Sequence, residues 1–128
     1  MEPIYTILYV ADVPRSVAFY RDLFDKAPVE DHPGFAMFIL ENGTAWGLWK
    51  REDVLPAATV QPGAVEFCLA VPSREALDAL ATDWKARGIP VPQEPVDLDF
   101  GYTFTALDPD GHRLRPFVPA SHTAAARS

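Results

Sequence analysis

The sequence predicts an α+β protein built from two tandem βαβββ modules, whose curved sheets enclose a cleft. An alternating strand followed by a capped amphipathic helix occurs near the N-terminus and again halfway along the chain. Each strand–helix pair is followed by further strand-like segments that are separated by turn residues. A repeated supersecondary unit indicates two modules that bury each other's faces. The strand faces opposite the helices are then expected to line the cleft.

Composition and charge limit the class of protein. The chain has 128 residues, of which 48% are hydrophobic and 23% charged, as in a globular domain. Its net charge of −7 argues against binding to nucleic acid. No apolar run approaches the ~20 residues of a membrane helix, and no secretory signal is visible, so we expect neither a membrane partner nor secretion. The single cysteine, Cys68, fits a cytoplasmic location.

The first module is predicted to span residues 4–50. Its predicted elements are a strand at residues 5–10, a helix capped by Asp12 that ends before Pro28, and strands at residues 35–40 and 44–49. Asn42 and Gly43 form a favourable hairpin turn between the last two strands.

The second module is predicted to span residues 64–118 after a linker at residues 51–63. Its predicted elements are a strand at residues 65–71, a helix from Ser73 that ends at Gly88, an edge segment from Val91, and strands at residues 102–107 and 113–118. Together, residues 1–119 are expected to form one domain, followed by a disordered tail at residues 120–128.

The most distinctive stretch is the turn and closing strand LDPDGHRLRPFV, residues 107–118. Pro109 presets the backbone of a tight turn, and Gly111 accepts a positive φ. Alternation then places Arg113, Arg115 and Phe117 on one face, which we interpret as part of the cleft. The alternative is an ordinary hairpin with solvated arginines.

Three stretches carry a resemblance to a known family: LYVADVPRSVAFYRDLF, VEFCLAV and FTALDPDGHRLRPFV. With the internal repeat, they resemble the vicinal oxygen chelate superfamily, which includes glyoxalase I, bleomycin-resistance proteins and extradiol dioxygenases. The resemblance covers nearly the whole chain and implies the glyoxalase/bleomycin-resistance fold. FGYTF, DPDGH and GLW are most similar to small drug-binding members such as phenazine-resistance proteins.

The resemblance implies four metal-ligand positions, which fall on Tyr5, Gly47, Glu66 and Arg115 in this sequence. Only Glu66 is a suitable metal ligand. The protonated phenol of Tyr5 is a poor ligand, Gly47 has no side chain, and the guanidinium cation of Arg115 repels a metal ion. The three histidines lie in a loop, a turn and the tail, so they do not converge on a zinc site. We therefore predict no metal and no other cofactor.

Without a metal, the charge of Glu66 lacks compensation in a cleft. We predict that Glu66 and Arg115 pair across the sheet at the former metal position. The alternative is that both side chains point to solvent.

Aromatic side chains on the same faces suit a planar ligand held by stacking, and Arg115 suits a carboxylate on such a ligand. The alternative for each aromatic residue is a place in the core. Trp46 is expected on the opposite face. The candidate ligand-binding residues are Tyr5, Tyr9, Gly47, Trp49, Glu66, Cys68, Tyr102, Phe104, Arg115 and Phe117.

The resulting hypothesis is a metal-free protein that binds a small aromatic molecule, in the manner of antibiotic sequestration. The resemblance also implies a homodimer. The alternative is a superfamily enzyme, namely a lyase, a dioxygenase or a thiol transferase, or a metal-free enzyme with Glu66 as base or Tyr5 as acid. Catalysis by Cys68 is disfavoured because no histidine is placed to activate it. A third possibility is a purely structural module with a collapsed cleft.

Overall fold

A computed structural model describes residues 1–120 of the chain. These residues form two compact units, and the boundary between the units lies between Val60 and Gln61. That boundary falls within the predicted linker. Of the tail predicted at residues 120–128, residues 121–128 lie outside the described residues. The amide of Ala120, the first residue of that predicted tail, donates to the carbonyl of Phe100 at 3.0 Å.

The first unit has the order βαβββ followed by a short 3-10 helix. Its elements are β1 (Tyr5–Val10), α1 (Val13–Phe24), β2 (Glu30–His32), β3 (Phe35–Ile39), β4 (Ala45–Lys50) and η1 (Arg51–Asp53). The strands form a sheet in the order β1-β4-β3-β2, in which β1 and β4 are parallel. The sequence pattern located every main element of this unit except the three-residue strand β2.

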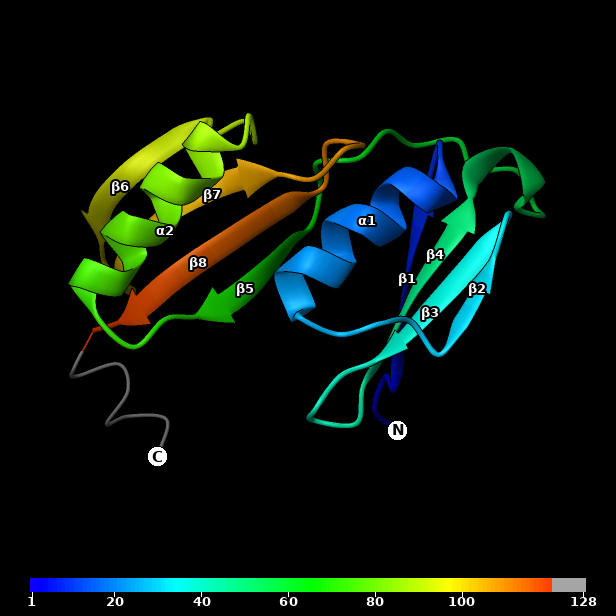
Figure 1. The fold of residues 1–128 in the computed structure, drawn as a ribbon, viewed down its shortest axis with the longest axis horizontal. Coiled ribbons are helices and arrows are strands. Elements are labelled where there is room, and N and C mark those ends of the chain that lie inside the picture. The colour runs from blue at the N-terminus through cyan, green and yellow to red at the C-terminus, as the bar shows by residue number, and fades with distance from the viewer. Residues whose placement is uncertain (121–128) are drawn as a thin grey trace. The chain divides into compact units, whose positions relative to one another are not determined.

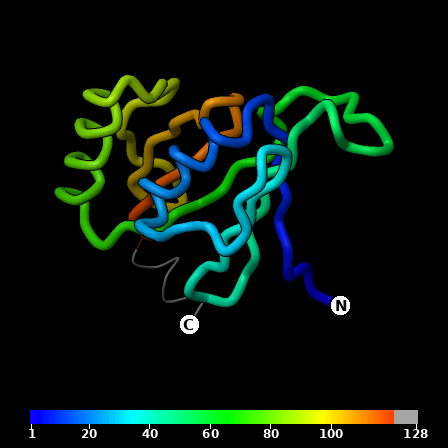
Figure 2. The backbone as a smooth tube through the Cα atoms, turned by 45° about the vertical axis from the view of Figure 1, so that its right-hand side comes forward, coloured from blue at the N-terminus to red at the C-terminus, as the bar shows by residue number. Residues whose placement is uncertain are grey.

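The second unit repeats this arrangement. Its elements are β5 (Glu66–Ala70), α2 (Arg74–Ala86), β6 (Gln93–Leu98), β7 (Gly101–Leu107) and β8 (Arg113–Pro119). Its sheet has the order β5-β8-β7-β6, with β5 and β8 parallel. The predicted α+β class and the two tandem βαβββ modules are therefore confirmed. Residues 54–65 connect the units without a helix or strand (Figure 2).

Both helices begin at the residues that the sequence indicates. Asp12 caps α1 by accepting the amide hydrogen of Arg15 at 3.1 Å, and Ser73 caps α2 by accepting that of Ala76 at the same distance. These side chains satisfy amides that have no partner within the helix. Gly88 takes a φ of +81° just beyond the end of α2, a conformation that glycine adopts without steric cost.

Each helix covers one face of the sheet in its own unit (Figure 1). In the first unit, Tyr20 and Phe24 of α1 pack on Trp46 of β4, with ring centroids 5.5 and 5.6 Å apart. In the second unit, Trp84 of α2 packs on Phe104 of β7 at 5.5 Å. The opposite face of each sheet carries no helix of its own unit. Among residues 1–120, neither helix is long and apolar enough to cross a membrane.

Candidate functional site

The open face of the first sheet, opposite α1, is apolar and aromatic. β1 turns Tyr5, Ile7 and Tyr9 to this face, where each is 38–39% exposed. The alternate residues Leu8 and Val10 are 5% and 0% exposed on the helix side. The alternation predicted for this strand is therefore confirmed, and two tyrosines lie on one open surface.

Trp49 joins this surface from the neighbouring strand. It lies beside Tyr9 in the parallel β1–β4 register, and their ring centroids are 6.3 Å apart at an interplanar angle of 81°. This edge-to-face geometry is a favourable arrangement for two aromatic rings. Trp46 points to the other face and is 7% exposed, as predicted. Trp49 is thus the tryptophan of this unit that a ligand on the open face would contact.

Gly47 is covered by the ring of Tyr5. A Cβ atom on Gly47 would lie 2.9 Å from Cε1 of Tyr5 and 3.3 Å from Cγ1 of Ile7. The missing side chain therefore makes room for the tyrosine ring. Burial, and secondarily the negative charge of Glu30, raises the pKa of Tyr5. The phenol is accordingly protonated at neutral pH and can donate a hydrogen bond.

The open face of the second sheet carries an ion pair. Nε of Arg115 lies 2.9 Å from both carboxylate oxygens of Glu66. The side chains are 11% and 38% exposed, respectively. The predicted pairing of Glu66 with Arg115 is therefore confirmed. In the β5–β8 register Cys68, and not Glu66, lies directly opposite Arg115, so the ion pair joins diagonal neighbours on the two strands. Tyr5 and Gly47 are diagonal neighbours of the same kind in the first sheet.

Three polar residues that sequence reasoning missed extend this pair into a network. Nη1 of Arg115 donates to Oε1 of Gln93 at 2.8 Å and approaches Oγ1 of Thr103 at 3.5 Å. Thr105 donates to the same oxygen of Gln93 at 3.0 Å. The alternation of threonine with aromatic residues in β7 was a visible signal for the two threonines. Gln93 carried no such signal.

Two predicted site residues lie on the wrong face. Phe104 is 0% exposed and packs on Trp84 of α2. The hydroxyl of Tyr102 donates to Asp78 of α2 at 2.6 Å, and this bond raises the pKa of Tyr102. The prediction that Tyr102 and Phe104 face the site is wrong because the helix-covered side of β7 takes the aromatic residues. The open side takes the threonines.

Phe117 lies on the open face of β8, as its alternation with Arg115 predicts. Its ring is 6.0 Å from that of Phe100, which precedes β7. The guanidinium carbon of Arg115 is 5.7 Å from the centroid of Phe100. Cys68 is an exposed free thiol on the same face. Phe100 is a further residue that sequence reasoning missed, and with Phe117 it places aromatic rings beside the ion pair.

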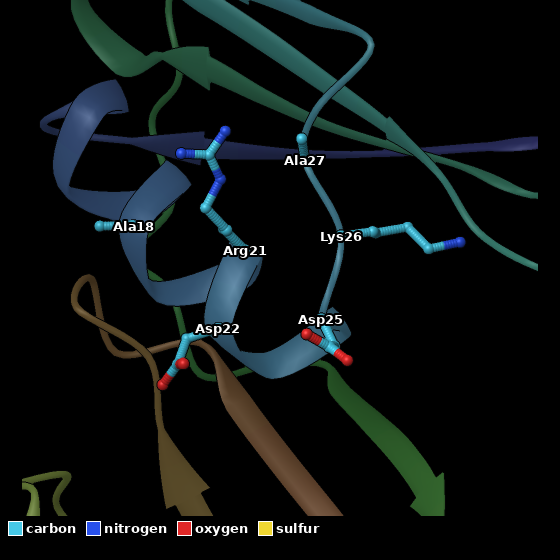
Figure 3. A pocket seen from close by; sticks show the side chains of 6 residues that line it. All are labelled: Ala18, Arg21, Asp22, Asp25, Lys26 and Ala27. Carbon is cyan, nitrogen blue, oxygen red and sulfur yellow. The ribbon is translucent and has the colours of Figure 1, made fainter.

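Two surface hollows occur elsewhere in the first unit. The larger has a volume of about 580 Å³ at the C-terminal end of α1 (Figure 3), and its lining residues are Ala18, Arg21, Asp22, Asp25, Lys26 and Ala27. Nζ of Lys26 donates to the carbonyl of Ile39 at 3.2 Å and so fastens the helix end to β3. The smaller, of about 330 Å³, lies beside η1. No candidate residue lines either hollow.

Comparison with known proteins identifies the family. A family model described as the Glyoxalase/Bleomycin resistance protein/Dioxygenase superfamily matches residues 3–115. The chain belongs to this superfamily. It is 34% identical over 116 residues to the phenazine antibiotic resistance protein EhpR of Enterobacter agglomerans, with 88% of each chain covered. The family resemblance read from the sequence motifs is confirmed.

Two solved structures have a similar fold. The solution NMR structure of protein ATC0852 from Agrobacterium tumefaciens is 44% identical, with a TM-score of 0.86 over 94% of this chain and 99% of that chain. A glyoxalase-related enzyme from Fulvimarina pelagi is 21% identical, with a TM-score of 0.80 over 92% of this chain and 88% of that chain. The second likeness concerns the fold alone.

The metal that the resemblance implies for superfamily enzymes does not fit the residues of this chain. At the four implied positions, Tyr5 carries a protonated phenol, Gly47 has no side chain, and Glu66 is held by the permanent cation Arg115. Among residues 1–120, no three His, Cys, Asp or Glu side chains are grouped so as to hold a metal ion. This donor set cannot supply the three or four converging ligands of a typical site.

Proposed function

We propose that this superfamily member binds a small planar aromatic molecule and confers antibiotic resistance by holding that molecule without transforming it. The observation that carries the proposal is the ion pair between Arg115 and Glu66. Arg115 stands at a position where, by the resemblance, a metal enzyme of this superfamily carries a ligand, and the rings of Phe100 and Phe117 lie beside it. The role fits the name of the relative EhpR, a phenazine antibiotic resistance protein that is 34% identical over 88% of each chain.

The first sheet supports the aromatic part of the proposal. Tyr5, Tyr9 and Trp49 share an open face that the helix of their own unit does not cover. Each ring that stacks on a planar ligand contributes about 0.5–1.5 kcal/mol beyond the burial of its area. Such a surface recognises flat molecules by shape and tolerates variation in their substituents.

The second sheet supports a polar anchor for the ligand. Arg115 is mostly buried, and its orientation is determined by bonds to Glu66 and Gln93. A guanidinium held in this way binds an anionic group with little loss of conformational entropy. We therefore expect Arg115 to orient a ligand on this face and the neighbouring rings of Phe100 and Phe117 to stack on it.

The competing enzyme function finds less support in these side chains. Both oxygens of Glu66 accept from Arg115, so the carboxylate is already engaged and is poorly placed to take a proton from a substrate. The raised pKa of Tyr5 makes its phenol a weaker acid. Cys68 is exposed, and within residues 1–120 the histidines of the turn and of β2 lie on other segments.

The first experiment is quenching of tryptophan fluorescence by phenazines and other planar aromatic antibiotics, with and without a chelator. Trp46 and Trp84 are buried at 7% and 4% exposure, whereas Trp49 lies on the open face. We expect saturable quenching that the chelator does not change and that is lost in Trp49→Phe. The matched control is Trp84→Phe, which removes a buried tryptophan of α2 and should keep the ligand-dependent quenching.

A calorimetric titration separates loss of the reporter from loss of binding. We expect Trp49→Ala to weaken binding of the best phenazine by roughly 3- to 10-fold, the amount that one stacked ring supplies. Absence of saturable quenching by every compound, together with a tightly bound metal in the purified protein, would overturn the proposal in favour of a superfamily enzyme.

A further inference from the structure

The amide of Gln93 has one orientation that its neighbours dictate. Its oxygen lies 2.8 Å from Nη1 of Arg115 and 3.0 Å from Oγ1 of Thr105. A guanidinium has only donors, so the group that faces Arg115 must be the oxygen of the amide and not its nitrogen. The amino group of Gln93 therefore points away from Arg115 and Thr105.

Two sets of donors remain for a ligand on this face. Within residues 1–120, neither the amino group of Gln93 nor Nη2 of Arg115 has a hydrogen-bond partner. Arg115 uses Nε for Glu66 and Nη1 for Gln93, which prevents the guanidinium from turning. The network thus offers N–H groups of Gln93 and Arg115 to a ligand, while the oxygens of Gln93 and Glu66 already accept hydrogen bonds.

The charges on this face favour an anion. β8 turns Arg113 and Arg115 toward it, and β5 turns Glu66 toward it, which leaves an excess of one positive charge. The acidic residues of β6 do not offset that charge, since Glu94 pairs with Lys85 of α2 and Asp97 with Arg74 of α2. These two carboxylates lie on the helix side of the sheet.

We propose that Gln93 is a specificity-determining residue, and that with Arg115 it selects planar aromatic ligands that carry a carboxylate. This inference rests on the proposed function and adds Gln93 as the residue that, beside Arg115, selects a carboxylate substituent. Glu66 and Thr105 act as positioning residues, because they hold Arg115 and Gln93 in the orientation that exposes their donors.

The test compares two probes, phenazine-1-carboxylate and unsubstituted phenazine, by calorimetric titration of the full chain. We expect the wild-type protein to bind the carboxylate at least tenfold more tightly, since a hydrogen bond to a charged group exceeds a neutral one. Gln93→Glu keeps an oxygen toward Arg115 and Thr105 but replaces the donor by a second oxygen. We expect it to weaken binding of the carboxylate tenfold or more and that of phenazine by less than threefold.

Two further variants separate charge, donor and folding effects. Ala79→Glu adds the same charge at an exposed position on α2 and should leave both affinities within twofold. Gln93→Met removes the donor without adding charge and should weaken the carboxylate probe roughly 3- to 10-fold. Far-ultraviolet circular dichroism and a melting curve show whether each variant is folded.

The outcomes distinguish the two proposals. If the wild-type protein binds both probes with equal affinity, or if Gln93→Glu lowers both affinities alike, the role of Gln93 is wrong while the proposed function stands. If neither probe binds, the role of Gln93 is wrong, and the wider panel of planar antibiotics decides the proposed function. Selective loss of the carboxylate probe in both Gln93 variants supports the inference.

Discussion

At the scale of single residues, the ion pair of Arg115 and Glu66 shows how one strand can host a mostly buried cation. Burial of an unpaired guanidinium is costly, and truncating one member of a buried pair leaves the other uncompensated. Here the carboxylate of Glu66 compensates the charge of Arg115, and the neutral oxygens of Gln93 and Thr103 lie within hydrogen-bond distance of its Nη1.

Two glycines provide a prediction at this scale. A Cβ atom on Gly101, which has a φ of +149°, would lie 2.1 Å from the carbonyl oxygen of Val118, an atom of the backbone. We expect Gly101→Ala to lower the free energy of unfolding by about 2–4 kcal/mol, because neither the strand nor the φ can adjust. Urea denaturation measures this change.

Gly47→Ala is the matched comparison. Its new Cβ would meet the end of the Tyr5 side chain, which is 38% exposed and can turn away. We expect a cost of about 1 kcal/mol in the free energy of unfolding. Equal losses in the two variants would show that Tyr5 is held over Gly47 as rigidly as backbone.

At the scale of elements, the turn between β7 and β8 depends on one buried carboxylate. Asp108 is 4% exposed, and its Oδ1 accepts the amide hydrogens of Asp110 at 2.9 Å and His112 at 2.8 Å. Gly111 takes a φ of +96° in this turn. The turn therefore sets where β8 begins, and with it the register that brings Arg115 opposite Cys68.

The start of α2 is fastened to β6 by charged groups. The guanidinium of Arg74 donates to both oxygens of Asp97, at 2.7 and 3.2 Å, and lies 3.9 Å from the centroid of the Tyr102 ring. The hydrogen bond from Arg74 lowers the pKa of Asp97 below its ordinary value of 3.8. Asp97 thus binds its proton less readily in the folded protein than in the unfolded chain.

This shift predicts part of the acid sensitivity. The stabilisation from Asp97 is fully present above pH 3.8 and is lost as the pH falls through the lower pKa of the folded state. We expect the melting temperature of Asp97→Asn to fall less steeply than that of the wild-type protein below about pH 4. The contribution is modest because the pair is exposed.

The control for this measurement is Asp99→Asn in the adjoining turn, for which residues 1–120 supply no ion pair. It should retain the acid slope of the wild-type protein. Parallel melting curves for Asp97→Asn and the wild-type protein would show that Arg74 does not hold Asp97 in solution.

At the scale of the whole molecule, each sheet of the described residues leaves an edge strand, β1 or β5, without a second neighbour and one face without a helix of its own unit. β1 pairs with β4 alone and β5 with β8 alone among residues 1–120. Apolar side chains such as Ile7 and Ile39 are 39% and 40% exposed in the single chain. Exposed edges and contiguous apolar faces favour association.

We therefore expect a homodimer with twice the 14.1 kDa mass of the chain in sedimentation equilibrium. Ile39→Lys places a charge on the open face of the first sheet and should shift the mass toward that of the monomer. A wild-type monomer across micromolar concentrations would contradict this expectation. Ile4→Lys, at a 77% exposed position before β1, is the charge-matched control.

Much of the fold follows from the sequence because local rules act within a few residues. Alternation gave the faces of β1 and β5, and Asp12 and Ser73 gave the starts of the helices. The repeat aligned Glu66 with Tyr5 and Arg115 with Gly47. Tyr5 and Gly47 lie diagonally across the first sheet, and Glu66 and Arg115 lie in the same diagonal relation across the second. The Glu66–Arg115 contact was predictable from that alignment, from the ligand positions that the family resemblance implies, and from the cost of an uncompensated charge.

Only the tertiary structure decided which face of β7 is open and where Gln93 lies. Alternation states that Tyr102 and Phe104 share a face, but the position of α2 determines that this face is covered. The register of β6 against β7 shifts between Gln93 and Val96, so no simple count along the chain places Gln93 beside Arg115. Local periodicity therefore determined the elements, whereas packing and an irregular strand register determined the polar half of the site.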